Sequence, residues 1–527
     1  MLRENRIWIG NNEAGQPVFM EPKMANRHGL VAGATGTGKT VTLKVMAETF
    51  SEMGVPVFMA DVKGDIAGMI NPGADSEDMQ ERIKRFGLAE QGFQFEGFPA
   101  NLWDIYGEKG IQLRTTISEM GPLLLSRILD LNELQSDILT VIFKIADDNN
   151  MLLMDIKDLK AMLAYVDENS GAFQADYGKI SSASIGVITR ALVSLETAGG
   201  DKFFGEPALN LSDWLAQENG KGIINILDSS SLINNGRLYS TFLLWLLSEL
   251  FELMPEVGDL DKPKMIFFFD EAHLLFTDAP KALLEKIEQV VKLIRSKGVG
   301  VYFCTQNPKD IPGGVLAQLN NKIQHGLRAY TPAEQKGVEA AAESFRANPG
   351  FDTYETILNL GTGEAVVSFL DEGGVPTVAE KVAILPPRTS FGTITDDQRN
   401  QKVQASLLYS KYATPVDSES AYEFLQRKGL EDQQAAEAAQ AEAEAAKAKE
   451  AEEKEAAKIA EKEEREAEKE AKAKAREMKK VGNTVMGTVG REVGKNLGKA
   501  FGPFGKTLGG NLGAQLARGI MNTLIKK

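Results

Sequence analysis

The chain has 527 residues, more than the roughly 250 to 300 at which a single hydrophobic core stops growing, which argues against a one-domain protein. Its net charge of -15 argues against a nucleic-acid coat protein that is basic throughout. The single cysteine, Cys304, excludes an intrachain disulfide, and no long apolar run suggests a signal peptide or a membrane-spanning helix, so a cytoplasmic location is expected.

Residues 1–28 hold two short alternating runs, RIWIG and PVFM, which predict an N-terminal β-hairpin. Apolar runs with helix-like segments between them then follow in two blocks, 29–111 and 216–400. The runs are HGLVAGA, VPVFMADV, GIINILDSS, KMIFFFDEA and GVGVYFCTQN. Near-continuous apolar strands of this kind predict an α/β core with a mostly parallel sheet that is covered on both faces.

Between the two blocks, residues 112–215 follow a period of 3.6 and predict a helical insertion with few strands. After Thr331, the runs AVVSFL and VAILPPRTSFG predict a last strand followed by an extended segment. Residues 401–430 are expected to form connecting helices.

Residues 431–480 are almost entirely Ala, Glu and Lys, with many opposite charges four positions apart. Few bulky residues occupy the positions that a coiled coil would need, which favours a solvated single helix over a coiled coil. Fifty helical residues would span about 75 Å at about 1.5 Å per residue, so the segment is interpreted as a spacer.

The tail, residues 481–527, carries apolar residues at every fourth position, with glycines following the same spacing up to GPFG. This pattern predicts two amphipathic helices with closely approaching ridges. The stripes would be buried on each other, on the core, on another subunit or on a membrane surface. From Ala471 to the end the chain has 12 basic and 2 acidic residues, so the tail is basic.

The sequence GATGTGKT matches the phosphate-binding loop G-x-x-x-x-G-K-[ST] in full, after an apolar strand and before a helical run. Backbone amides around its glycines can surround phosphate oxygens, and the helix N-terminus adds a favourable dipole. Lys39 is expected to contact the β- and γ-phosphates of ATP, and the Thr40 hydroxyl to bind Mg²⁺. The predicted nucleotide-binding residues are Gly33, Ala34, Thr35, Gly36, Thr37, Gly38, Lys39 and Thr40.

Asp270 and Glu271 follow the apolar run MIFFF, so both are expected at the carboxyl edge of the sheet. There Asp270 would hold Mg²⁺ and Glu271 would polarise the attacking water, which predicts hydrolysis as well as binding. Gln306, after VYFCT, would sense the γ-phosphate or orient water. Asp61 is either a further nucleotide-site residue or an ordinary strand-to-turn aspartate, and Cys304 is expected to be a small buried apolar residue.

The motifs RHGLVAGATGTGKT, ADVKGD, FFFDEAHLLF, IRSKGVGVYFCTQNPKDIP and LRAYTPAE together resemble the HerA/FtsK superfamily of P-loop motor ATPases, and most closely the bacterial HerA-like (YjgR-type) group. The resemblance implies a RecA-like ASCE core and a homo-oligomeric ring, a hexamer, with catalytic sites between subunits. It also implies an arginine finger, for which Arg295 matches best and Arg328 and Arg27 are alternatives.

The leading hypothesis is a cytoplasmic, Mg²⁺-dependent ATPase that moves DNA without sequence specificity, as a translocase or helicase, with a nuclease or another protein as a further partner. The alternative is an ATP-driven motor or switch that acts on protein or membrane partners through the tail, without a nucleic-acid substrate. The two differ in whether DNA stimulates hydrolysis.

Overall fold

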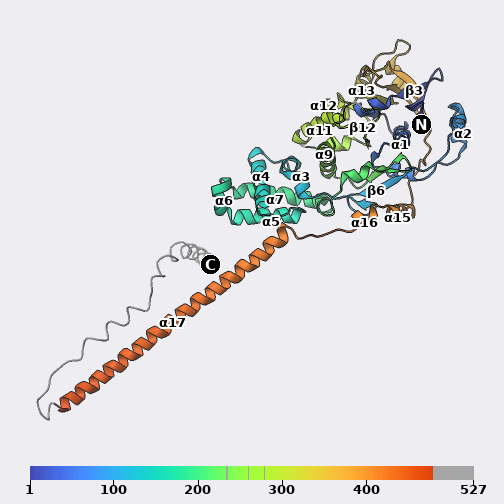
Figure 1. Ribbon diagram of the computed structural model, residues 1–527. Helices are drawn as coiled ribbons and strands as arrows, with labels where there is room; N and C mark the ends of the chain where they lie inside the picture. The colour runs from blue at the N-terminus through green and yellow to red at the C-terminus, as the bar shows by residue number, and fades with distance from the viewer. Residues whose placement is uncertain (233–234, 259, 278, 280, 479–527) are drawn as a thin grey trace. The chain divides into compact units, whose positions relative to one another are not determined.

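The computed structural model describes residues 1–232, 235–258, 260–277, 279 and 281–478 (Figure 1). The strands are β1 (Leu2–Arg3), β2 (Arg6–Asn12), β3 (Pro17–Met20), β4 (Gly29–Ala32), β5 (Val57–Asp61), β6 (Ala100–Asp104), β7 (Ile111–Gln112), β8 (Gln217–Glu218), β9 (Lys221–Gly222), β10 (Ile224–Asp228), β11 (Met265–Phe269), β12 (Val299–Thr305), β13 (Asn321–His325), β14 (Glu364–Ser368) and β15 (Glu380–Ile384).

The α-helices in the same residues are α1 (Lys39–Glu52), α2 (Glu77–Arg85), α3 (Ile117–Ile128), α4 (Glu133–Asp148), α5 (Ile156–Glu168), α6 (Ser170–Tyr177), α7 (Ser182–Leu195), α8 (Asp201–Phe203), α9 (Gly236–Leu253), α10 (His273–Phe276), α11 (Lys281–Ile294), α12 (Gly313–Leu316), α13 (Pro332–Glu343), α14 (Thr353–Asn359), α15 (Asp396–Ala405), α16 (Tyr409–Tyr412) and α17 (Ala421–Met478). Short helical turns include η1 (Pro22–Arg27) and η7 (Arg295–Lys297).

The described strands build a 13-stranded sheet in the order β1-β2-β15-β14-β13-β4-β12-β11-β5-β10-β6-β7, with β3 paired to β2. All pairs from β13 to β7 are parallel, and the pairs from β13 outward to β1 are antiparallel. The predicted α/β fold with a mostly parallel sheet is therefore confirmed. The runs RIWIG and PVFM do form an antiparallel hairpin, β2 with β3, which joins this sheet.

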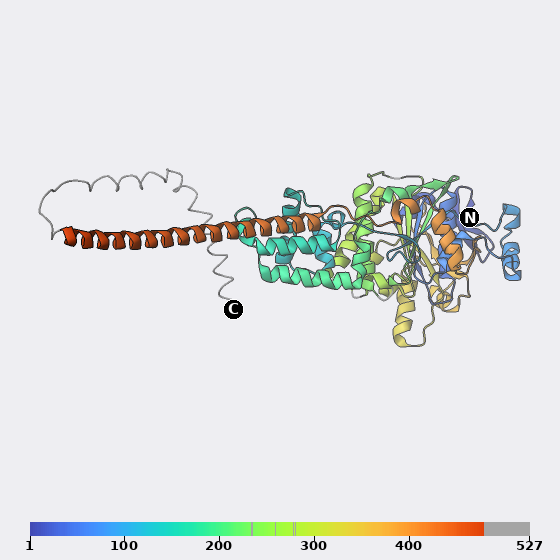
Figure 2. The ribbon, with the colours of Figure 1, turned by 90° about the horizontal axis from the view of Figure 1, so that it is seen from below.

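Alternation along β11 explains how the sheet is covered on both faces. Phe268 and Tyr302 pack against Phe50 of α1. Phe267 lies on the other face and packs against Phe58, which in turn contacts Phe242 of α9. Because successive side chains of a strand point to opposite faces, one apolar run serves both helix layers, and Figure 2 shows helices on either side of the sheet.

Two strands of the core were not expected. The segments ANLWD and NKIQH form β6 and β13, and β13 lies directly beside β4. Their polar residues hide the apolar pattern that marks the other core strands. The prediction of one last strand after Thr331 was also incomplete, because β14 and β15 pair with each other before the extended segment begins.

The extended segment after β15 lies along α1. The buried carboxylate of Glu48 accepts hydrogen bonds from the backbone N–H groups of Arg388 and Thr389 and from the Thr389 hydroxyl, at 2.6–3.2 Å. The ammonium group of Lys44 donates to the carbonyl of Ser390 at 2.6 Å. Helix α1, which follows the P-loop, is therefore held by this segment as well as by the sheet.

Helices α3 to α7 gather beside one another within the predicted insertion (Figure 1). Helices α3, α4 and α5 begin with capping boxes: Thr116, Asn132 and Asp155 each pair with the residue three positions on. Helix α3 bends at Gly121, which has a non-helical φ of 70° and is followed by Pro122.

Contacts divide the chain into two units, Met1–Glu431 and Asp432–Lys527. Helix α17 begins ten residues before the expected charged helix. Its start is fixed by Ser420, whose hydroxyl donates to Asp158 of α5 at 2.5 Å and whose N–H donates to Glu423 at 3.1 Å, contacts that composition does not reveal. Every side chain from Glu431 to Ala460 is exposed, as expected for a helix that is polar all round.

The predicted helical hairpin at 481–527 lies outside the described residues. In the part of the chain that the structure describes, no helix is both long and apolar enough to cross a bilayer.

Candidate nucleotide site

The loop from Gly33 to Gly38 joins β4 to α1 at the carboxyl edge of the sheet. Gly33 has a φ of 153° and Gly38 a φ of 110°, values that residues with a Cβ rarely adopt. A Cβ on Gly33 would lie 2.5 Å from the Cβ of His325. The glycines are therefore required by the backbone path and by the close approach of β13.

Lys39 is buried and its ammonium group turns back over the loop. It donates to the carbonyls of Gly33 at 2.6 Å and Ala34 at 3.1 Å. Thr35 and Gly36 at the tip of the loop are exposed, and Thr40 is half-buried. Because the loop ends at the N-terminus of the 14-residue helix α1, this arrangement offers an ammonium group and a helix dipole to an anion.

Asp270 and Glu271 lie near this loop, as the sequence predicted. They follow β11. This strand is separated from β4, the strand before the P-loop, by β12 alone, and all three strands are parallel. The Gly33 N–H donates to the carbonyl of Thr305, and the Ala272 N–H donates to that of Cys304. The end of β12 therefore holds both segments.

The pKa of the buried Cys304 thiol depends on the charges around it. Burial raises the pKa of Cys304 well above its usual range, the Asp270 carboxylate raises it further, and the Lys39 ammonium group opposes the shift. Its side chain is fully buried, as predicted. Cys304 belongs to β12, which lies between β4, the strand before the phosphate-binding loop, and β11, the strand before the carboxylates.

Glu271 is held by three side chains. It accepts a hydrogen bond from Lys63 at 2.6 Å and from Gln306 at 3.2 Å, and Nδ1 of His273 lies 3.3 Å from its Oε2. Burial acts to raise the pKa of Glu271, but the hydrogen bond and charge of Lys63 outweigh it, so the pKa is lowered. The residue has a φ of 46°, a left-handed conformation that is uncommon outside glycine and frequent at functional sites.

Asp270 is suited to a metal ion. It is 1% exposed, and its Oδ2 has no hydrogen-bond donor among the described residues. Burial raises the pKa of Asp270, against the effects of Cys304 and Lys63. The described residues contain no group of three His, Cys, Asp or Glu side chains that would hold a metal. An ion at Asp270 would therefore need the Thr40 hydroxyl and ligands from a substrate, as Mg²⁺ in phosphate sites does.

Asp61 is engaged in the turn that follows β5. Its two oxygens accept from the N–H groups of Gly64 at 2.7 Å and Ala67 at 2.9 Å. Burial raises its pKa to about 7, and these hydrogen bonds oppose the rise. The contacts match the strand-to-turn interpretation, and a role for Asp61 in nucleotide binding stays a prediction.

The three candidate arginines are divided between two edges of the sheet. Arg295 is exposed in η7 before β12, and Arg27 ends η1 before β4, so both lie at the edge opposite the P-loop. The seven residues of β12 span about 23 Å at about 3.3 Å per residue, too far for Arg295 to reach the P-loop of its own chain. Arg328 lies beyond β13 at the P-loop edge, where it donates to the carbonyl of Leu358 at 2.9 Å.

Sequence reasoning missed two residues of this site. Lys63 lies in the ADVKGD motif, but nothing in the motif shows that its partner is Glu271. His325 lies beneath the P-loop, with Nε2 2.9 Å from Thr42 Oγ1 and Nδ1 2.9 Å from the Glu364 carbonyl. It was missed because its strand, β13, was not recognised.

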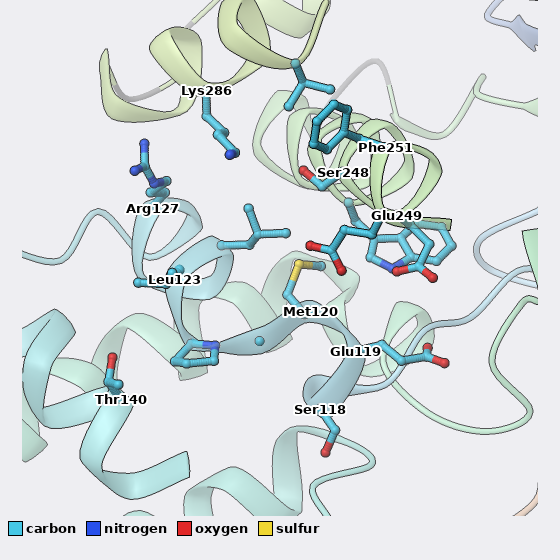
Figure 3. A pocket seen from close by; sticks show the side chains of 16 residues that line it. Ser118, Glu119, Met120, Leu123, Arg127, Thr140, Ser248, Glu249, Phe251 and Lys286 are labelled. Atoms are coloured by element: carbon cyan, nitrogen blue, oxygen red, sulfur yellow. The ribbon is translucent and has the colours of Figure 1, made fainter. Parts of the chain in front are cut away.

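A separate pocket of about 520 Å³ opens between α3, α4, α9 and α11. Figure 3 shows Met120, Glu249 and Lys286 extending into it from three different helices. Burial raises the pKa of Glu249, and the charges of Glu119 and Glu252 add to the shift. None of the residues that line this pocket belongs to the P-loop or to the Asp270 segment.

The parallel core, the glycine-rich loop before α1 and the buried carboxylates after β11 define a P-loop NTPase of the HerA/FtsK superfamily. The model of the family "Helicase HerA-like C-terminal" matches residues 6–514. The chain therefore belongs to this family.

Curated relatives match parts of the chain. It is 35% identical over 116 residues to the probable helicase MJECL08 of Methanocaldococcus jannaschii, a match that covers 21% of this chain and 20% of that protein. It is 23% identical over 349 residues to the DNA double-strand break repair helicase HerA of Sulfolobus acidocaldarius, covering 65% of this chain and 62% of that one. The chain thus spans less than two thirds of these relatives.

Among solved structures, the unbound monoclinic form of the bacterial conjugative coupling protein TrwBΔN70 is similar, with a TM-score of 0.50 and 17% identity. The match covers 75% of this chain and 92% of that one. At this identity the likeness shows the fold alone.

Proposed function

We propose that this protein is a Mg²⁺-dependent ATPase that assembles into a homo-oligomeric ring, a hexamer, in the cytoplasm and uses hydrolysis to translocate DNA. The observation that carries the proposal is the convergence of the Lys39 loop and the Asp270–Glu271 pair on the end of β12. The family and the DNA repair helicases among the relatives support DNA as the substrate.

In this function each side chain has a separate task. The P-loop amides and Lys39 bind the phosphates of ATP, and Thr40 and Asp270 would hold Mg²⁺, which would supply positive charge to the phosphates. Glu271 accepts a proton from the attacking water, and Gln306, which donates to Glu271, orients that water. In the nucleotide-free site the lowered pKa of Glu271 keeps the carboxylate ionised.

The position of Arg295 favours a site shared between subunits. Because it lies at the opposite edge of its own sheet, it can stabilise transition-state charge only in the site of a neighbour. A closed ring of head-to-tail contacts supplies such a neighbour to every subunit.

Hydrolysis is tested with Glu271→Gln, which keeps the shape of the side chain and removes the base. Turnover should fall by about 10² to 10⁴-fold while ATP still binds. The control is Glu285→Gln on α11, whose side chain is 64% exposed and pairs with Lys281. Equal turnover in the wild type and the Glu271 variant would show that this carboxylate is not the base.

The shared site is tested by mixing Arg295→Ala with Lys39→Ala, each inactive alone. In randomly mixed rings about a quarter of the sites combine an intact P-loop with an intact neighbouring arginine, so about a quarter of the wild-type activity should return. No recovery in rings shown to be mixed by native mass spectrometry would contradict a finger at Arg295.

DNA as substrate is tested by ATPase and gel-shift assays with double- and single-stranded DNA over a range of salt. Backbone-directed binding predicts stimulation that weakens as salt rises. An ATPase that neither form of DNA stimulates would favour a protein or membrane partner.

A further inference from the structure

The turn that carries Lys63 is fixed on both sides. Asp61 accepts from the N–H groups of Gly64 and Ala67, and Lys44 of α1 donates to the carbonyl of Asp65 at 2.7 Å. The backbone at Lys63 is therefore tied to the end of β5 and to the helix that follows the P-loop. Only its long side chain remains free to change partners.

In this structure Lys63 pairs with Glu271. Its ammonium group lies 2.6 Å from Glu271 Oε1, and the lysine side chain is 42% exposed while the glutamate is 5% exposed. The pair occupies one of the two carboxylate oxygens with a strong charge-assisted hydrogen bond. A glutamate held in this way is less available to a water molecule.

The γ-phosphate of ATP is an alternative partner for the ammonium group of Lys63. Lys39 already lies over the phosphate-binding loop, and Lys63 reaches the carboxylate that must act beyond the last phosphate. The γ-phosphate distinguishes ATP from ADP and carries more negative charge than one carboxylate. A lysine carries a compact charge on a flexible four-carbon stem, so it can exchange a carboxylate for a phosphate group that lies within its reach.

We infer that Lys63 is a positioning residue that holds Glu271 in the nucleotide-free site and moves to the γ-phosphate when ATP binds, which releases Glu271 toward the attacking water. The inference rests on the proposed ATPase function and adds to it a means of distinguishing ATP from ADP. Hydrolysis removes the γ-phosphate, and the lysine then returns to Glu271.

The test compares binding of ADP with that of the β,γ-imido analogue of ATP by calorimetry in Mg²⁺. Lys63→Met should weaken binding of the analogue about tenfold and leave ADP binding unchanged. Lys63→Arg should restore the preference for the analogue. The matched control is Lys309→Met, which removes a lysine from the turn after core strand β12, where its backbone N–H donates to Asn307 Oδ1 at 3.1 Å.

A second variant tests the exchange itself. Glu271→Gln frees Lys63 from its partner, so it should raise affinity for the analogue relative to ADP, and the rise should vanish in the double variant with Lys63→Met. Equal effects of Lys63→Met on both nucleotides, or additive effects in the double variant, would overturn the inference. A wild-type chain that binds neither nucleotide would instead overturn the proposed function together with it.

Discussion

The imidazole of His325 should stay uncharged far below the pH at which an exposed histidine takes up a proton. It is fully buried beneath the P-loop, and burial lowers its pKa from 6.5 to about 4, with the Glu364 carbonyl opposing the shift and the Lys39 charge adding to it. Since a carbonyl only accepts, Nδ1 carries the proton and Nε2 accepts from the Thr42 hydroxyl. The ring thus links β14 and β13 to the helix of the P-loop.

The expected magnitude follows from this difference in pKa. At about pH 5.5, an exposed histidine is about 90% protonated, whereas one with a pKa of about 4 is about 3% protonated. Below about pH 6.5 the imidazole of His325 binds a proton in the unfolded chain but not in the folded chain. The contribution of His325 to the free energy of unfolding is therefore complete above this pH. It decreases by about 3 kcal/mol as the pH falls to about 4.

The sequence makes the assay simple because it has only 3 histidines: His28, His273 and His325. In protein labelled with ¹³C at the histidine rings, substitution of each histidine by glutamine assigns one signal. The His325 signal should keep its neutral position between about pH 7.5 and 5.5. Burial also lowers the pKa of His28 to about 4, so its signal should behave in the same way. A His325 signal that moves by the full protonation shift in this range would refute the buried, neutral ring.

Three further predictions concern fixed points of the fold. Gly33→Ala, whose Cβ would lie 2.5 Å from that of His325, should lower the free energy of unfolding by about 1–3 kcal/mol and weaken ATP binding, whereas Gly171→Ala, with open space around it, should be neutral in both assays. Asp61→Ala removes two hydrogen bonds to a carboxylate and should cost about 2–4 kcal/mol in thermal unfolding; lost nucleotide affinity without lost stability would instead support a direct contact. Glu48→Ala should expose the amides of Arg388 and Thr389 to hydrogen exchange, and unchanged protection there would contradict its role in holding the segment after β15.

Local patterns were enough to predict that the P-loop and the two carboxylates lie at the carboxyl edge of the sheet. The eight-residue loop from Gly33 to Thr40 needs glycine where the backbone has positive φ, and the glycines of the sequence indicate these positions directly. The run MIFFFDE shows a buried strand that ends in two carboxylates, because an apolar run must lie inside the sheet and its polar end must lie at an edge. The same reasoning predicted the hairpin at the N-terminus and the helical insertion.

The partners of these residues were decided only by the tertiary structure. Lys63 meets Glu271, and His325 meets Thr42, across more than 200 positions of sequence. The strand NKIQH is recognisable as β13 only from its neighbours, β4 and β14. Composition and periodicity record which side of an element is buried, but the order in which parallel strands lie beside one another depends on the packing of the whole sheet. That order, and not any local motif, brings the lysine, the glutamate and the phosphate-binding loop together.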